Sequence, residues 1–194
     1  MNPQIIFFLN KSLESLRNSN LNSAELYLEQ ANRLQKNNPH VLRLFGVVYA
    51  QRKQYQDALK YFSKSLKHLP NNVLTLSNLG NVYVELGDYE SALKAYDSAI
   101  KIEPKYDEVW TNKGILLGKM NRHQEALDFH DKAISLRANY AEAWSNKGNN
   151  LCALERYEEA LINYQKAIDL NPGYAECWYN KANVLVNLKI FNDA

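Results

Sequence analysis

Cysteine and histidine are scarce in this chain, whose 194 residues include two cysteines and four histidines. Cys152 and Cys177 have no second pair, so their spacing fits neither a disulfide framework nor a zinc site. His123 and His130 stand two turns apart on one expected helix, but no third ligand has a matching spacing. We therefore predict two free thiols, no metal, no cofactor and no catalytic residues. These absences indicate a protein that is not an enzyme and that resides in the reducing cytoplasm.

Long apolar runs and an excess of one charge are also missing. The run from Ile5 to Leu9 lacks a preceding basic region, and Lys11 and Glu14 follow it, which argues against a signal peptide. No stretch reaches the roughly 18 apolar residues that a transmembrane helix needs. Lys and Arg number 23 against 21 Asp and Glu, a formal net charge of +2. This balance offers no broad basic surface, so we expect neither nucleic acid nor a membrane as a partner.

What the sequence does contain is a repeat with a period of 34 residues. Alanine and glycine mark it at one position each: Ala24, Ala58, Ala92, Ala126, Ala160 and Ala194, and Gly46, Gly80, Gly114 and Gly148. This period is typical of stacked helix-turn-helix units, which are stable only against their neighbours. We therefore predict an all-α solenoid forming a single array over residues 1–194. Its repeats would be 5–38 (degenerate), 39–72, 73–106, 107–140, 141–174 and 175–194 (partial).

Each repeat is expected to hold two helices that pack closely. A large residue at position four, glycine at eight and another large residue at eleven share one stripe of the first helix. Glycine inside a helix costs about 1 kcal/mol relative to alanine, so its recurrence predicts close approach of the second helix. At position four, Trp110, Trp144 and Trp178 should lie in the core. Gly87 and Asn121 should end first helices in the left-handed conformation, and Lys53, Glu155 and Lys189 occupy this turn in the other repeats. In the last repeat the second helix should begin at Phe191.

The order of Trp, Gly, Tyr, Ala, aromatic, Ala and Pro at positions 4, 8, 11, 20, 24, 27 and 32 resembles the tetratricopeptide repeat family. Residues 78–104 follow the family pattern nearly throughout. The resemblance implies a right-handed superhelix in which first helices line a concave groove. It also implies a protein that binds other proteins.

Asparagine recurs where the resemblance places the groove. Position six carries Asn78, Asn112, Asn146 and Asn180, and position nine carries Asn81, Asn149 and Asn183. An asparagine amide both donates and accepts, so such a ladder could bind the backbone of an extended peptide whatever its side chains. At position six the ladder resembles the groove of the O-linked N-acetylglucosamine transferases, with Leu44 marking its end. The alternative is that these amides only satisfy groups between stacked helices, and it weighs more at position nine.

Two charged patterns favour no further ligand. Glu108, Glu142 and Glu176 at position two would repel the acidic terminus that the chaperone-binding carboxylate clamps of the family hold, so we exclude that function. Lysines recur at position seven, but lysine stems commonly lie over apolar neighbours while the ammonium group reaches water.

We therefore predict a non-enzymatic scaffold that binds a protein or an extended peptide in its groove. One alternative is that the chain is the substrate-recruiting arm of a larger enzyme, such as a glycosyltransferase, because it ends inside a repeat. Another is a scaffold that assembles end to end, because the unfinished C-terminal edge would expose apolar surface.

Overall fold

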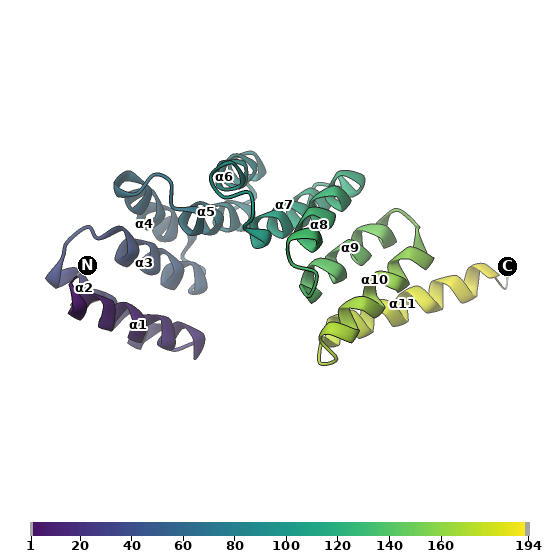
Figure 1. The fold of residues 1–194 in the computed structure, drawn as a ribbon, viewed down its shortest axis with the longest axis horizontal. Helices are drawn as coiled ribbons and strands as arrows, with labels where there is room; N and C mark the ends of the chain where they lie inside the picture. Colours follow the sequence, from purple (N-terminus) through teal and green to yellow (C-terminus); the bar gives the residue numbers. More distant parts are fainter. Residues whose placement is uncertain (1, 193–194) are drawn as a thin grey trace. The chain divides into compact units, whose positions relative to one another are not determined.

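The computed structural model describes residues 2–192, and every regular element in that range is an α-helix. The helices are α1 (Pro3–Arg17), α2 (Leu21–Leu34), α3 (Pro39–Gln51), α4 (Tyr55–His68), α5 (Val73–Glu85), α6 (Tyr89–Ile102), α7 (Asp107–Lys119), α8 (His123–Leu136), α9 (Ala141–Ala153), α10 (Tyr157–Leu170) and α11 (Ala175–Asn192). The all-α repeat fold that the period predicts is therefore confirmed. Figure 1 shows successive helices running back and forth as pairs.

The helices form two compact units. Unit 1 spans Met1–Ile102 and contains α1 to α6, and unit 2 spans Glu103–Ala194 and contains α7 to α11. Within each unit the strongest contacts join the two helices of one repeat, such as α3 with α4 and α9 with α10. Successive repeats of a unit then meet through a second helix and the first helix that follows it, as α8 meets α9. The single array over 1–194 stays a prediction.

Left-handed residues separate the two helices of each complete repeat. Gly87 and Asn121 have φ of 76° and 59°, so both predicted caps are confirmed. Lys53 and Glu155 adopt φ of 61° and 60° at the equivalent place, although neither residue favours this conformation. At Lys189 no such turn occurs, and α11 continues to Asn192. The expectation of a second helix beginning at Phe191 is therefore wrong, because the first helix is not terminated at the equivalent position.

The aromatic rings of the second helices pack directly against the recurring glycines of the first helices. A Cβ atom added to Gly46 would lie 2.5 Å from the Phe62 ring, and one added to Gly148 would lie 2.7 Å from the Tyr164 ring. Neither contact could be accommodated without moving the ring or the helix. The recurring alanines of the second helices are fully buried at the same interface: Ala24, Ala58, Ala92, Ala126 and Ala160. Close helix approach, predicted from glycine in register, is thus confirmed.

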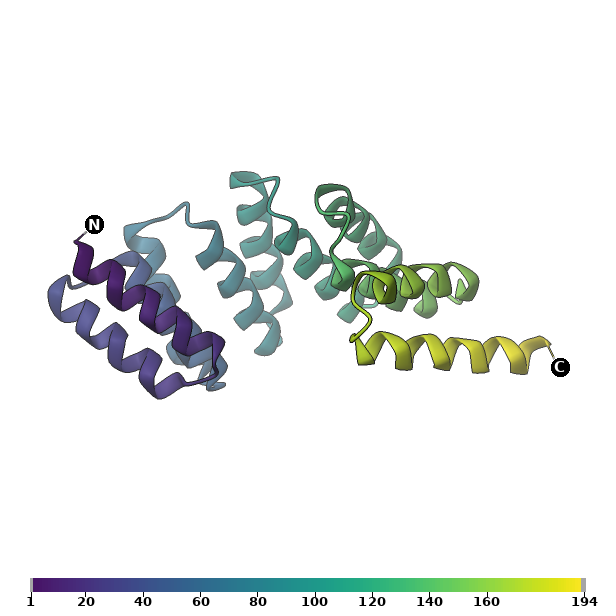
Figure 2. The ribbon, with the colours of Figure 1, turned by 60° about the horizontal axis from the view of Figure 1, so that its bottom comes forward.

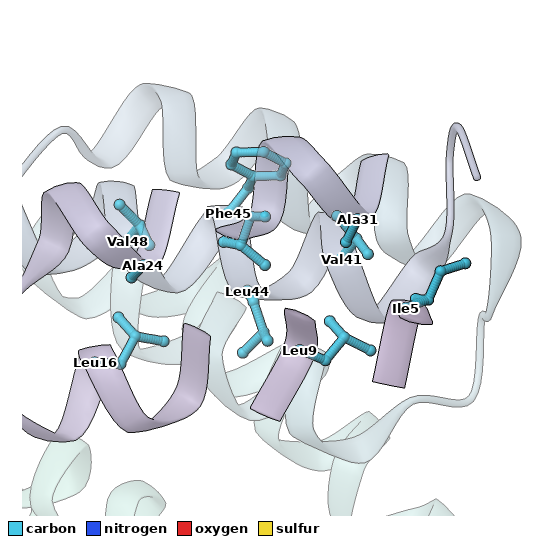
Figure 3. Close-up of a cluster of buried hydrophobic side chains, with 10 residues drawn as sticks. Ile5, Leu9, Leu16, Ala24, Ala31, Val41, Leu44, Phe45 and Val48 are labelled. Carbon is cyan, nitrogen blue, oxygen red and sulfur yellow. The ribbon is translucent and has the colours of Figure 1, made fainter. Parts of the chain in front are cut away.

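The core of unit 1 begins at its first repeat, which the sequence identified as degenerate. Ile5 and Leu9 of α1 gather with Ala31 of α2 and with Val41 and Leu44 of α3, as Figure 3 shows. All of these side chains are at most 9% exposed. Residues 5–38 therefore form a helix pair that is packed like the others, despite their weak match to the period.

Tryptophan is less buried than we predicted. Trp110 and Trp144 are half-buried, and Trp178 is 49% exposed, so the prediction that all three lie in the core is wrong. Each indole N–H donates to a carbonyl that closes the preceding repeat: Pro104 O at 2.9 Å, Ala138 O at 2.9 Å and Pro172 O at 3.0 Å. This polar bond requires the ring to lie at the rim, where one edge meets the connecting turn.

Helix α11 forms an edge of unit 2 and contacts α9 and α10 (Figures 1 and 2). Cys177 and Val184 of α11 are buried against them. Leu185 at position eleven is 50% exposed, whereas Leu151 at the same position of the preceding repeat is 1% exposed. The difference arises because Leu151 is covered by the second helix of its own repeat, which has no counterpart after α11 in the described residues.

Candidate functional site

First helices lie next to one another within each unit. In unit 1, α3 contacts both α1 and α5, and in unit 2, α9 contacts both α7 and α11. The resemblance assigns positions two, five, six, nine, twelve and thirteen of these helices to a groove. The described cavities at these helices are lined chiefly by those positions, together with the aromatic residues of the second helix.

Unit 1 has a cavity of about 350 Å³ between its second and third repeats, which we call the apolar pocket. Its walls are mostly carbon, and Glu85 at one end is its charged group. Glu85 accepts a hydrogen bond from the Tyr55 hydroxyl at 3.2 Å. The lining residues are Val47, Ala50, Gln51, Tyr55, Phe62, Asn78, Asn81, Val82 and Glu85.

Two further cavities, each of about 330 Å³, continue from the apolar pocket toward α1. The middle cavity shares Val47, Gln51 and Asn78 with the apolar pocket. It shares Leu13, Arg43 and Leu44 with the last one, which reaches Ile6. The three cavities thus lie side by side across α1, α3 and α5, and together we call them the unit 1 groove.

Unit 2 has a cavity of about 270 Å³ between α9, α10 and α11, which we call the amide pocket. Four asparagines line it together with two tyrosine rings, Cys152 and Val184. The lining residues are Asn149, Cys152, Tyr157, Tyr164, Asn180, Asn183, Val184 and Asn187.

The two pockets occupy the same place in the repeat. Positions 9, 12, 17 and 24 of one repeat and positions 6, 9, 10 and 13 of the next line both of them. Val47 therefore corresponds to Asn149, and Glu85 corresponds to Asn187. One repeat geometry thus produces an apolar cavity in one unit and a polar one in the other.

A third equivalent place, between α7, α8 and α9 within unit 2, is filled by Asn150 at position ten. Its Nδ2 donates to Asn146 O at 2.9 Å, which fixes the orientation of the amide because a carbonyl only accepts. The same Nδ2 lies 3.2 Å from His130 Nε2, and Oδ1 lies 2.9 Å from His123 Nδ1. Gly118 makes room, since a Cβ there would lie 2.7 Å from Asn150 Oδ1.

The arrangement requires His130 to be neutral. Its Nε2 must accept from the Asn150 amide, so the ring proton lies on Nδ1, which is buried without a hydrogen-bond partner. Burial lowers the pKa of His130 to about 4, and the nearby Asp131 and Lys147 act on it in opposite directions. Among the described residues, no group of three or more His, Cys, Asp or Glu side chains could hold a metal ion.

The position-nine asparagines accept from the tyrosines at position 24. Tyr96 Oη donates to Asn81 Oδ1 at 2.6 Å, and Tyr164 Oη donates to Asn149 Oδ1 at 2.7 Å. Burial raises the pKa of both tyrosines, which keeps their hydroxyls protonated as donors. Because Oδ1 is engaged, Nδ2 is the group of each asparagine left to donate toward a ligand. Asn183, the third of the set, is exposed at the rim of the amide pocket.

The position-six asparagines are all half-buried on first helices. Asn78 lines the apolar pocket and the middle cavity of unit 1. Asn180 lines the amide pocket and donates to Asn149 Oδ1 at 3.0 Å. Asn112 and Asn146 lie on α7 and α9, and the backbone oxygen of Asn146 holds Asn150.

Sequence reasoning missed three parts of this surface. Asn10 stands at position six of the degenerate first repeat and lines the unit 1 groove, so Leu44 interrupts the series there rather than ending it. The period alone could have found Asn10. Arg17 lines the same groove without recurring in other repeats, beside Arg43, which the sequence already places at position five, one of the expected groove positions. Asn150, finally, is a polar residue at position ten, which is apolar in the preceding three repeats and in the following one.

The ammonium groups of the lysines at position seven contact neighbouring side chains rather than only reaching water. Lys113 Nζ lies 4.6 Å from the centre of the Phe129 ring. Lys147 pairs with Asp131 at 2.6 Å, and Lys181 donates to Gln165. Both cysteines are free, as predicted, and burial raises the pKa of the Cys152 thiol, which disfavours the reactive thiolate at neutral pH.

These features, helix pairs in register with grooves between first helices, define a helical repeat protein. Models of the tetratricopeptide repeat match residues 39–72, 61–94 and 107–140, and a model of the TPR repeat matches 80–121 and 148–189. The chain belongs to the tetratricopeptide repeat family. Its repeats support a role as a protein-interaction scaffold. No curated protein matches the chain in sequence.

Solved structures agree with the fold. A thermophilic TPR protein from Thermus thermophilus is 19% identical with a TM-score of 0.82, over 94% of this chain and 99% of that one. A tetratricopeptide repeat protein from Parabacteroides merdae is 21% identical with a TM-score of 0.75, over 97% and 75%. YrrB, described as a TPR protein with an unusual peptide-binding site, is 24% identical with a TM-score of 0.66, over 90% of both chains.

The models that match this chain are all of repeats, and the structural neighbours are TPR proteins, an architecture typical of protein-interaction scaffolds. Within residues 2–192, none of the helices combines the length and hydropathy needed to cross a membrane.

Proposed function

We propose that this protein binds an extended segment of a protein partner along its first helices, with asparagine amides bonding the backbone of that segment. The residues are Asn78, Asn112, Asn146 and Asn180 at position six, and Asn81, Asn149 and Asn183 at position nine. The observation that carries the proposal is the engagement of Asn81 and Asn149 by buried tyrosines. Each tyrosine holds the amide oxygen, so the amide nitrogen has one defined orientation before a ligand arrives.

Preorganised donors suit a peptide backbone. An extended peptide offers a carbonyl acceptor at every residue, and a fixed amide meets it without losing side-chain freedom on binding. The backbone carries no sequence information, so the amides would contribute affinity while specificity comes from the pockets beside them. A peptide-binding site in the structural neighbour YrrB is in keeping with this use of the fold.

The test is the selection of peptides from a random library displayed on phage, followed by titration of the selected peptides against the full chain. We expect at least tenfold weaker binding when Asn78, Asn112, Asn146 and Asn180 are replaced together by alanine, since each lost bond is worth about 0.5–1.5 kcal/mol. Asn71→Ala, an exposed site outside the first helices, is the matched control. Circular dichroism first shows that the variants are folded. Equal binding by the quadruple variant and the native chain would assign these asparagines to packing alone.

A second candidate is end-to-end assembly through α11, which presents Trp178, Leu185 and Val186 at 49%, 50% and 58% exposure. Light scattering over a concentration range would show a mass that rises for the native chain and stays constant for Leu185→Glu. A constant monomer mass for both would reject assembly. The cytoplasm stays our prediction for where the protein acts.

A further inference from the structure

The unit 1 groove differs in chemistry from the asparagine ladder. Its three cavities share wall residues, so a bound segment that runs from α1 across α3 to α5 would contact all three. Its amides are Asn10 on α1, Gln51 on α3, and Asn78 and Asn81 on α5, and Leu44 stands at position six of α3. Most of the other lining residues are apolar. A ligand of this groove must therefore be recognised mainly by other groups.

The walls of the groove expose large apolar side chains. Ile6 and Leu74 are each 45% exposed, and Leu13 is 36% exposed. Leu9, Leu16 and Val82 form the floor and are almost fully buried. Exposed apolar surface that is contiguous and concave marks a place where a partner removes that surface from water.

Charge in the groove is divided between its two ends. The two cavities near α1 are lined by Arg17, Arg43 and His40, and no carboxylate belongs to their walls. At the α5 end, the apolar pocket has Glu85 as its charged group. The formal charge of the chain is only +2, so this separation is a local property of the groove.

Arg43 is the group best placed to hold an anion. It lines both cavities near α1 and is half-buried, with its Nε shielded from water. An ion pair beside apolar walls is screened less than one in open water. Arginine also presents a planar fork of donors that matches a carboxylate.

We propose that the unit 1 groove binds a protein segment whose aliphatic side chains enter the cavities and whose Asp or Glu carboxylates pair with Arg43 and Arg17. The segment lies with its acidic part over α1 and α3. The part over α5 is neutral or basic, because Glu85 would repel a carboxylate there. This assignment does not depend on the asparagine ladder, which concerns backbone contacts on other repeats as well.

Apolar walls distinguish this partner from a nucleic acid. Phosphate backbones are bound by many cations and by aromatic rings that stack on bases. The two cavities near α1 offer aliphatic side chains and two arginines. An acidic, aliphatic peptide satisfies both features at once.

The experiment uses three fluorescein-labelled peptides that share one leucine–alanine framework and carry glutamate, glutamine or lysine at the polar positions. Fluorescence anisotropy with the full chain should show the glutamate peptide binding about tenfold or more tightly than the lysine peptide, with an affinity that falls as salt rises. Arg17→Glu with Arg43→Glu should abolish this preference or reverse it toward lysine. Arg33→Glu, an exposed site on α2, is the control for added negative charge and should leave the preference intact.

Three outcomes would overturn the proposal. They are failure of the glutamate peptide to bind, equal binding of the lysine peptide, or the same loss of preference with Arg33→Glu as with the groove variant. The chain in which Asn78, Asn112, Asn146 and Asn180 are alanine separates the two proposals. It should keep the preference for glutamate over lysine, whether or not the affinity for all three peptides falls.

Discussion

The apolar pocket of unit 1 and the amide pocket of unit 2 share eight lining positions of the repeat, and at four of these positions the side chains differ. Position nine is Val47 in one and Asn149 in the other, and position thirteen of the next repeat is Glu85 or Asn187. The residues that fix the backbone, such as Gly46 and Gly148, are the same in both. Packing residues therefore set where a cavity lies, and the residues around them set what it can hold.

The place between α7, α8 and α9 extends this comparison. It has the same backbone, but Asn150 occupies the space, with Gly118 opposite it and two histidines as its partners. The same place in the repeat can thus be an apolar cavity, a polar cavity or a contact between polar side chains. Single residues decide which of these it is, and the fold does not change.

The largest effect is expected from removing an aromatic ring at position 24, which lines each of the two pockets. Phe62→Ala should lower the free energy of unfolding of unit 1 by about 3–5 kcal/mol, because the fully buried ring leaves a cavity against Gly46. All three tryptophans lie in unit 2, so their fluorescence reports unit 2 alone, while circular dichroism reports both units. In urea, the dichroism transition should move more than the fluorescence transition. Equal shifts would mean that the units unfold together and would remove the basis for treating them as separate.

Acid should lower the free energy of unfolding of unit 2 through the buried His130, which contacts Asn150. The pKa of His130 is lowered to about 4, below the ordinary value of about 6.5 that applies in the unfolded chain. The stabilisation is complete above pH 6.5, declines as the pH falls toward 4, and levels off below it, because protons bind the unfolded chain first. The whole difference corresponds to roughly 3 kcal/mol.

Tryptophan fluorescence during urea unfolding at several pH values measures this decline. The double variant His130→Tyr with Asn150→Val carries the residues that repeat 73–106 has at these positions, Tyr96 and Val82. Its free energy of unfolding should depend less on pH between 6.5 and 4. His68→Gln, at an exposed site, should leave the dependence as it is. An unchanged slope in the double variant would show that His130 is not the source.

Removing the Asn150 amide is expected to lower the free energy of unfolding by a smaller amount. Asn150→Ala removes the hydrogen-bond partner of both His123 and His130, and an unsatisfied buried group costs about 1–3 kcal/mol. Unfolding followed by tryptophan fluorescence measures the loss. Asn149→Ala in the neighbouring amide pocket is the comparison and should cost less, because Tyr164 Oη keeps its contact with Cys152 Sγ at 3.4 Å and Asn180 lines the cavity. A neutral result for Asn150→Ala would contradict the described network.

The smallest effect on stability is expected from exchanging the lining residues at position nine. Val47→Asn and Asn149→Val should each change the free energy of unfolding by about 1 kcal/mol or less, since both positions are half-buried. The affinity for peptides should change instead. Val47→Asn should weaken binding of the glutamate peptide described above, because it makes the unit 1 groove more polar. If both exchanges leave every peptide affinity unchanged, position nine does not determine what the pockets hold.

The sequence predicted the backbone well because the residues that fix it recur with a strict period. Gly80, Ala92 and Tyr96 occupy the places expected for them, and the left-handed turn at Gly87 follows from its freedom of φ. The equivalent turns at Lys53 and Glu155 are imposed by the packing of the flanking helices, and neither residue type signals them. Trp178 was misjudged because a bulky residue at a regular position was equated with the core.

The candidate site was less predictable. Asparagine at positions six and nine marks first-helix faces, and the tyrosine partners of Asn81 and Asn149 could have been inferred from the recurring aromatic at position 24. The unit 1 groove depends on residues that do not recur, such as Arg17 and Leu13, whose proximity to Arg43 arises only when α1 packs on α3. Whether the asparagines bind a peptide stays a prediction.

The contact of Asn150 with His130 also limits how the gene for this chain can be rearranged. Tandem repeats change number when one unit is deleted or copied, and such events are harmless only if every unit fits every other. Here Gly118, His123 and His130 belong to one repeat, and Asn150 belongs to the next. Deleting residues 141–174 would put Val184 opposite His130 and leave both imidazoles without the amide. Repeats 107–140 and 141–174 are therefore expected to be gained, lost and inherited as a pair.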